Sequence, residues 1–359
     1  MYTPIIRNRP SEVRAIQELA TEVKAHCTPL LDLAAPSKKS DKVSAQGYVE
    51  RNIRRMVKAL KGFEHVLVDS SELDPALRIK GSKHPLIEAA SAVVEAGCSP
   101  VPVTGLHRDE SHAKAALKIK SSPGSGLICF RLDATDISTA SLSYKQLQGL
   151  LADSSLNPTD VILLLDLQSV YGGQVDSLVT LVARFIAQIM KSQWAGLIVA
   201  GYGVPDRLTD AIAVRAQGYI QRVERSVYLG VKKAHSIDKL WFGDYTTLSP
   251  THVELDWKLM SKVMGPKAIY TLTESWFVVR GAPFSGHVDG YGQYHNLAAE
   301  IRALEEFPGP EYSFGDNYIH ECATKAASTG SPASWITACV NHHITLSAEI
   351  DPHDPCLNR

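Results

Sequence analysis

The sequence predicts a (β/α)8 barrel of the TIM-barrel type, followed by a C-terminal cap or extension. Two observations support this α/β fold class. Eight short apolar runs recur along the first 245 residues, and segments with the periodicity of amphipathic helices lie between them. Alternating strands and helices are typical of a parallel sheet covered by helices. An open, doubly wound sheet is the alternative, because a pattern of runs does not show whether the sheet closes.

The eight apolar runs are the predicted strands, and they begin near positions 4, 29, 66, 101, 127, 161, 197 and 240. The clearest is VILLLDLQS at 161–169, in which five apolar residues in a row precede Asp166. A continuous apolar run of this kind is typical of a strand buried on both faces. This strand therefore ends at a carboxylate, which is costly to bury without a partner.

Three of the intervening segments show helical patterns most clearly. The segment SEVRAIQELATEVKA at 11–25 starts with Ser11 in the position of a cap and places apolar residues along one stripe. HPLIEAASAVVEAG at 84–97 ends in a glycine, and VDSLVTLVARFIAQIM at 175–190 is apolar enough to pack against a sheet. Each segment predicts a helix on the outer surface of the sheet.

The chain divides into a barrel at 1–267 and a C-terminal region at 268–359. A ninth apolar run, AIYTLTESWFVV at 268–279, breaks the regular alternation of apolar runs and helical segments. Three further helical or turn-rich segments follow it. Since a barrel needs only about 250 residues, this region is expected to complete or cap the barrel. The run at 268 is the alternative to the run at 240 as the eighth strand.

The composition limits the classes of partner that the protein is expected to bind. The net charge is −1 and the isoelectric point is near 6.9, so nucleic acid is an unlikely partner. No apolar stretch approaches the roughly 20 residues that cross a bilayer, and the start MYTPIIRNRP lacks the features of a signal peptide. We expect a cytoplasmic protein without a membrane partner. The six cysteines form no CxxC pair, which favours reduced, buried thiols.

Charged residues follow most of the predicted strands. In a barrel these strand ends share one rim, where barrel enzymes keep their active sites. The residues are Arg7, Arg9, Asp32, Asp69, Arg131, Asp133, Asp166, Asp244 and Tyr245. Alternation along the fifth strand places Cys129, Arg131 and Asp133 on one side, which we expect to face the barrel mouth.

This ring of charges has two interpretations. In the first, Asp32, Asp166 and Asp244 hold Mg²⁺ or Mn²⁺ while Arg7, Arg9 and Arg131 bind phosphate, an arrangement suited to phosphoryl or phosphodiester chemistry. Asp166, Asp244 and Tyr245 are then the candidate catalytic residues. In the second, the acids and arginines only pair with one another at the barrel mouth.

Other motifs are weaker. Neither a GxxxxGK[ST] loop nor a GxGxxG turn after the first strand occurs, so P-loop and Rossmann nucleotide sites are not supported. AGYGVPDR follows the seventh strand, where Gly201 and Gly203 serve either an anion site or a tight turn. The pair His342 and His343 cannot both face one metal on a helix, which favours a structural role.

Several stretches resemble the beta protein family of phages and bacteria. They are YTPIIRNRPSEVRAIQEL, TPLLDL, FGDY, WFVVRG, GYGQYHNLA, FGDNYIHECA and SPASWITACVNHHITL, which run in order from Tyr2 to about Leu346. The family is functionally uncharacterised, so the resemblance implies a barrel-like fold in one continuous unit and supplies no reaction. The positions it highlights overlap the rim and add Arg280, Tyr294, Asp316, Trp335, Asn341 and His342.

Two functions follow as hypotheses. The first is a barrel that binds a phosphorylated small molecule or nucleotide at the strand-end rim, either as a ligand sensor or as an enzyme that acts on it. The second is a non-catalytic phage or phage-defence module that engages a protein partner through its aromatic C-terminal region. The aromatic residues in question are Tyr291, Tyr294, Tyr312, Phe314, Tyr318 and Trp335.

Overall fold

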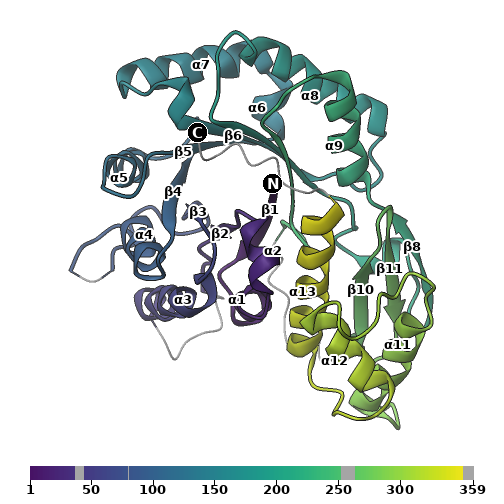
Figure 1. Cartoon of the computed structure of the whole chain (residues 1–359). Helices are drawn as coiled ribbons and strands as arrows, with labels where there is room; N and C mark the ends of the chain where they lie inside the picture. Colours follow the sequence, from purple (N-terminus) through teal and green to yellow (C-terminus); the bar gives the residue numbers. More distant parts are fainter. Residues whose placement is uncertain (37–43, 80, 252–262, 351–359) are drawn as a thin grey trace.

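Eight parallel strands close into a barrel in the computed structural model, which describes residues 1–36, 44–79, 81–251 and 263–350 (Figure 1). The strand order is β1-β2-β3-β4-β5-β6-β7-β9, and β1 pairs with both β2 and β9. The strands are β1 Tyr2–Arg7, β2 Leu30–Asp32, β3 His65–Asp69, β4 Ser99–Thr104, β5 Ile128–Leu132, β6 Val161–Ser169, β7 Gly196–Tyr202 and β9 Leu240–Asp244. The predicted (β/α)8 fold is confirmed, and the open sheet is excluded by the β1–β9 pairing.

Helices surround the barrel. They are α1 Pro10–Gln17, α2 Thr21–Ala25, α3 Ala45–Leu60, α4 Pro85–Glu95, α5 Glu110–Lys120, α6 Ala134–Ser138, α7 Ala140–Asp153, α8 Val175–Ile189 and α9 Val223–Ala234. On α8, Val182, Phe185, Ile186 and Ile189 are buried at helical spacing, as its sequence predicts. The segment 11–25 forms two helices rather than one, because the chain leaves the helical conformation between Gln17 and Thr21.

A second, antiparallel sheet lies beside the barrel, with strand order β10-β11-β8. It consists of β8 Gln217–Gln221, β10 Lys267–Thr271 and β11 Ser275–Arg280. Helix α11 Gln293–Arg302 packs on this sheet, and α12 Phe314–Ala323 packs on α11. The alternative that the run at 268 forms the eighth barrel strand is therefore wrong, since that run pairs with β11. The strand β8 comes from the barrel half of the sequence, so the two parts of the chain are interleaved.

Helix α13, Pro332–Ile350, joins the second sheet to the barrel. It packs against α1, β1 and β10, and it lies beside α1 in Figure 1. Two of its side chains bond to the backbone of the first helix: Thr337 donates to Ser11 O at 3.0 Å, and Asn341 donates to Ala15 O at 3.0 Å. Helix α13 thus attaches the C-terminal region to the barrel.

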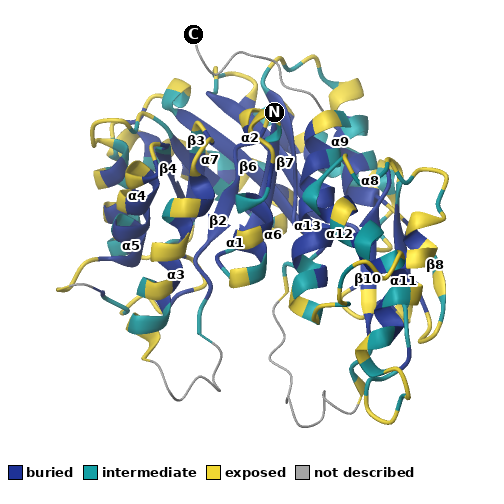
Figure 2. Cartoon of the chain, turned by 60° about the horizontal axis from the view of Figure 1, so that its bottom comes forward, coloured by how far each residue is buried: buried dark blue, intermediate teal, exposed yellow. Residues whose placement is uncertain are grey.

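The apolar core has two layers separated by the barrel strands. Ile5, Leu30, Leu67, Cys129, Ile162, Leu164 and Trp241 pack inside the barrel, whereas Ile6, Leu31, Val68, Phe130, Leu163 and Phe242 pack against the helices. Figure 2 shows the buried strands within a shell of helices whose outer faces are exposed. Because successive side chains on a strand alternate, this division fixes which strand-end residues face the barrel interior.

The described cysteines Cys27, Cys98, Cys129, Cys322 and Cys339 are buried free thiols, and Cys356 lies outside the described residues. In the described ranges, none of the helices combines the length and apolar composition needed to cross a membrane.

Candidate functional site

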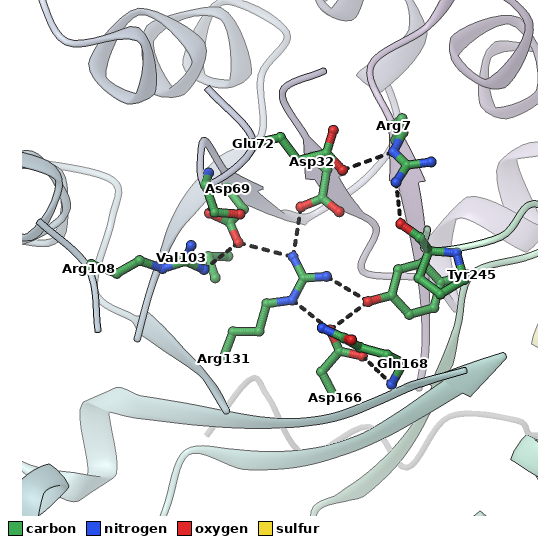
Figure 3. Close-up of polar contacts among 12 residues, drawn as sticks. Arg7, Asp32, Asp69, Glu72, Val103, Arg108, Arg131, Asp166, Gln168 and Tyr245 are labelled. Carbon is green, nitrogen blue, oxygen red and sulfur yellow. Dashed lines mark hydrogen bonds and ion pairs between the residues drawn. The ribbon is translucent and has the colours of Figure 1, made fainter. Parts of the chain in front are cut away.

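Arg131 stands at the centre of the carboxyl-end rim and binds three carboxylates (Figure 3). Its Nη1 donates to Asp32 Oδ1 at 2.8 Å and to Asp69 Oδ2 at 3.0 Å, and its Nε donates to Asp166 Oδ2 at 2.8 Å. These acids end β2 and β3 and lie on β6, so four strands meet at one guanidinium. The surrounding carboxylates hold the pKa of Arg131 above its usual value, against the opposing effect of burial.

Tyr245 completes the arrangement around Arg131. Its hydroxyl accepts a hydrogen bond from Arg131 Nη2 at 2.8 Å and donates one to Asp166 Oδ2 at 2.5 Å. Together with the three carboxylate contacts, the bond to Tyr245 occupies four of the five N–H donors of Arg131, when only the described residues are counted as partners. The carboxylates therefore hold the guanidinium in place, and one N–H remains for a ligand.

Strand β6 has an irregularity directly after Asp166. Gln168 has φ of 55°, in the left-handed region, and its N–H donates to Asp166 Oδ1 at 3.0 Å. The register between β6 and β7 shifts between Asp166 and Ser169. A non-glycine residue in this region is uncommon, and such strain is a frequent feature of functional sites. This irregularity fixes Asp166 and brings Gln168 to the rim.

A cavity of about 370 Å³ opens over this cluster. Its lining includes five carboxylates and two arginines, contributed by Asp32, Glu72, Asp133, Asp136, Asp166, Arg108 and Arg131. His107 also lines it, with its Nε2 3.0 Å from Asp136 Oδ1, and so do Gln168 and Tyr245. Among the described residues that line the cavity, acids therefore outnumber arginines by three, which favours the binding of a cation.

Asp32 lines the cavity and has a perturbed proton affinity. Burial raises its pKa to about 6, with Arg131 lowering it and Asp69 and Glu72 raising it. Its Oδ1 accepts from Arg131, while the described contacts leave Oδ2 for other partners. A carboxyl group that titrates near neutral pH and lines a cavity is suited to proton transfer.

Asp69 behaves differently from Asp32. Burial favours its neutral form, but Arg108 and Arg131 hold its pKa below the usual value. Arg108 Nη2 donates to Asp69 Oδ2 at 2.8 Å, and the Ser71 N–H donates to Asp69 Oδ1 at 2.9 Å. Asp69 is therefore a permanent anion that positions two arginines.

Arg7 reaches the edge of the same site, as Figure 3 shows. Its Nε bonds Glu72 Oε1 at 2.9 Å, its Nη1 donates to Ser249 O at 3.1 Å, and its Nη2 donates to Pro250 O. These contacts tie the loop after β9 to the cavity wall. Neither Arg7 nor Arg9 lines the cavity itself, and Arg9 is the N-cap residue of α1.

Asp244 lies in a separate buried cluster, although it precedes Tyr245 in the chain. Alternation on β9 turns Tyr245 inward and Asp244 outward, toward α13. Asp244 accepts from Tyr2 Oη at 2.6 Å, from His343 Nε2 at 2.9 Å and from Arg222 Nη2 at 3.3 Å. The structure therefore does not bring Asp244 together with Asp32 and Asp166.

Gly201 and Gly203 contact Glu224 of α9. A Cβ on Gly203 would lie 2.1 Å from Glu224 Oε2, and one on Gly201 would lie 3.3 Å from Glu224 Cβ. Both positions are buried. The glycines allow a carboxylate to approach the end of β7, which is an unfavourable setting for phosphate.

A divalent cation requires several oxygen ligands that are not already committed. Within the described ranges, no group of three histidine, cysteine, aspartate or glutamate side chains is arranged to hold a metal ion. Asp32 and Asp166 instead accept from Arg131. Among the described residues, these two acids at the rim are therefore partnered by a guanidinium.

The aromatic residues of the C-terminal region pack mainly on one another. Tyr294 and Trp335 stack with ring centroids 4.7 Å apart, and both are buried. Tyr318 packs edge-on against Trp335 at 5.8 Å. Tyr291 is half exposed. This set serves chiefly as a core for the second sheet.

Sequence reasoning missed several residues of the cavity, namely Glu72, His107, Arg108, Asp136 and Gln168. All follow the barrel strands β3, β4 and β5 or end β6. The signal that points to them is the rim rule itself, applied to the loops after the strands as well as to the final strand residues.

Comparison with known proteins adds a family and a relative. A family model described as Beta protein matches residues 2–348. The curated sequence Protein beta of Enterobacteria phage P4 is 26% identical over 363 aligned residues, which cover 97% of this chain and 93% of the phage protein. The match includes both the barrel and the second sheet.

Proposed function

Because the chain belongs to the beta protein family, whose description names no activity, we propose its function from the cavity: the barrel binds a small molecule that carries a positively charged nitrogen group. The observation that supports this proposal is the excess of carboxylates around the 370 Å³ cavity, where Arg131 already neutralises part of their charge. An ammonium or guanidinium group would complete that neutralisation.

Asp32 is the expected contact for the positive group. Asp32 lines the cavity, and Arg131 bonds to its Oδ1, so its Oδ2 is the oxygen expected to accept from the ligand. The remaining N–H of Arg131 and the Gln168 side chain provide hydrogen bonds to polar parts of the same ligand. Where the ligand reacts, Asp32 is the group that would take up or return a proton.

A phosphorylated small molecule or nucleotide, which the rim arginines suggest from the sequence, fits less well. Its phosphate would face the acid excess unless Mg²⁺ or Mn²⁺ entered with it, held by one or two carboxylates and the phosphate oxygens. Such a ligand would therefore bind only as its metal complex. This dependence separates the two ligand classes by experiment.

The test is thermal stabilisation by diamines, guanidino compounds and amino sugars, compared with nucleotides and sugar phosphates with and without Mg²⁺. A ligand at 100 times its dissociation constant adds about 2.7 kcal/mol to the free energy of unfolding. We expect a shift with an amine or guanidine that disappears in Asp32→Asn. Glu305→Gln, an exposed acid on the C-terminal unit, is the matched control and should keep the shift. A shift only with phosphate and Mg²⁺ together would instead support the phosphorylated ligand.

The affinity for the amine is expected to depend on pH through Asp32. Since burial raises the pKa of Asp32 to about 6, the carboxylate that attracts the cation is lost as the pH falls through that value. The dissociation constant should rise about tenfold for each pH unit below 6, and calorimetric titration between pH 5 and 8 measures it. A constant affinity across this range would exclude Asp32 as the contact.

Asp32→Asn is also expected to stabilise the folded protein at neutral pH. A carboxyl group whose folded pKa of about 6 exceeds its usual value of 3.8 contributes stability at low pH, and that contribution is lost as the pH rises through 6. The neutral asparagine retains it, so at pH 7.5 the variant should gain up to about 3 kcal/mol. The gain should vanish at pH 4, which urea unfolding at both pH values would show. A loss at pH 7.5 would mean that Asp32 is a structural partner of Arg131 alone.

A further inference from the structure

A second cavity of about 210 Å³ lies next to the first, and Ser71, His107 and Arg108 line both. Ser70 and His112 also line this second cavity, together with the apolar side chains of Leu73, Pro75 and Pro85. Ser70 directly follows Asp69 at the carboxyl end of β3, so it occupies the rim on which barrel enzymes place reactive groups.

The hydrogen bonds of His112 fix its tautomer. Its Nε2 lies 2.8 Å from the carbonyl oxygen of Val103, which can only accept, so Nε2 carries the hydrogen. In the neutral ring Nδ1 is then the acceptor nitrogen, and it lies 3.2 Å from Ser70 Oγ. The serine hydroxyl therefore donates to the basic nitrogen of a histidine whose other nitrogen is anchored to β4. This is the geometry of a nucleophile and its general base.

The surroundings favour proton transfer from Ser70 to His112. His84 packs edge-on against His112 with ring centroids 5.6 Å apart, and burial, with His112 and Arg78 contributing, lowers the pKa of His84 to about 4. His84 thus stays uncharged at neutral pH. The buried Asp69 carboxylate is close enough to His112 for the two charges to interact, which would stabilise an imidazolium. Ser70 and His112 are both nearly fully buried, and both line the second cavity.

We propose that this second cavity is an acyl-transfer site for small carboxylic esters, with Ser70 as the nucleophile and His112 as the general base. Ser70 Oγ forms a bond to the ester carbonyl carbon while its proton passes to His112 Nδ1. The negative charge on the carbonyl oxygen faces Arg108, which lines the cavity. Collapse breaks the bond to the alkoxide, which takes the proton from His112 and leaves as an alcohol.

Water then releases the acyl group. It attacks the acyl-serine carbonyl carbon and gives a proton to His112 Nδ1; collapse breaks the bond to Ser70 Oγ, which regains that proton. The net reaction converts an ester and water into a carboxylic acid and an alcohol. Leu73, Pro75 and Pro85 would contact the acyl chain, and the cavity volume limits that chain to a few carbons.

The experiment treats the folded full-length protein with a short-chain alkyl fluorophosphonate and locates the adduct by peptide mass spectrometry. We expect a single adduct on Ser70, absent in Ser70→Ala. His112→Gln keeps a donor for Val103 O and an acceptor for Ser70 but lacks the base, so it should label roughly 100-fold more slowly. The control variant Ser91→Ala removes an exposed serine of α4, and its Ser70 should be labelled at the wild-type rate.

Hydrolysis of p-nitrophenyl acetate provides a second readout, with a burst of p-nitrophenol expected from wild type and none from Ser70→Ala. An unlabelled Ser70 in the folded wild-type protein would overturn the proposal, and so would equal labelling rates in wild type and His112→Gln. Neither outcome bears on the amine proposal for the first cavity, because that proposal is tested by ligand-induced stabilisation.

Discussion

Replacing Arg131 with methionine is expected to lower the free energy of unfolding by about 3 to 5 kcal/mol at pH 7. Methionine has similar length but no charge, so Asp32, Asp69 and Asp166 would lose the cation that binds all three. Buried carboxylates without a partner are strongly destabilising, and three of them would also repel one another. Urea unfolding of wild type and variant at pH 7 measures the difference.

The pH dependence of this loss identifies its cause. Without Arg131 the three carboxyl groups would have raised pKa values in the folded state, so their penalty is present at high pH and is relieved as the pH falls and they bind protons. The double variant Arg131→Met, Asp32→Asn has one charge fewer to bury and should recover part of the loss at pH 7. A loss below about 1 kcal/mol, or one that is equal at pH 5 and pH 7, would show that water solvates the acids and that Arg131 is not their main partner.

The sequence predicts the rim around Arg131, because the carboxyl ends of parallel barrel strands lie at the same end of the barrel. That rule predicts that Arg131, Asp166 and Tyr245 lie close together, and hydrogen bonds join them in the structure. Which acids would bind Arg131 was not predictable, because Asp32 and Asp69 are distant in sequence and several other acids end strands. Closure of the barrel decides that pairing.

Asp244 and Tyr245 illustrate a second limit. They are adjacent in a strand, so their side chains must point to opposite faces, but both faces of a barrel strand are buried and apolar. The sequence FGDY therefore does not tell which residue faces the interior. Packing of α13 decides it, since His343 lies against the outer face and binds Asp244.

The second sheet shows which part of the strand order the sequence does not predict. Strand β8 has the sequence QGYIQ, in which only Ile220 is buried, so its apolar signal is too weak to detect. Pairing with β11 sets the place of β8 in the sheet, for example through the pair Trp276 and Ile220. The aromatic C-terminal region likewise has the composition of a binding surface, yet its largest side chains, Trp276 and Trp335, are fully buried.

Asp244→Asn is expected to lower the free energy of unfolding by about 3 to 5 kcal/mol, as large an effect as that of Arg131→Met. Burial alone would raise the pKa of Asp244, yet His343, Arg222 and Tyr2 hold it below its usual value, so the residue is an anion that its neighbours require. Asparagine would face Arg222 Nη2 and His343 Nε2 with fewer acceptor sites and no charge. Thermal unfolding measures the loss, and exposed Asp153→Asn on α7 is the control with an expected change within 0.5 kcal/mol.

The location of the cluster predicts where the weakened structure opens first. Asp244 on β9 contacts Tyr2 of β1 and His343 of α13, so its loss should increase hydrogen exchange in α13 more than in α4 or α5 on the other side of the barrel. Adding Arg222→Met should restore part of the stability, because it removes the unpaired cation. Glu224, the other partner of Arg222, can then become neutral, since burial already raises its pKa to about 7. Failure of that second substitution to recover any stability would mean that lost hydrogen bonds, rather than an unpaired charge, cause the effect of Asp244→Asn.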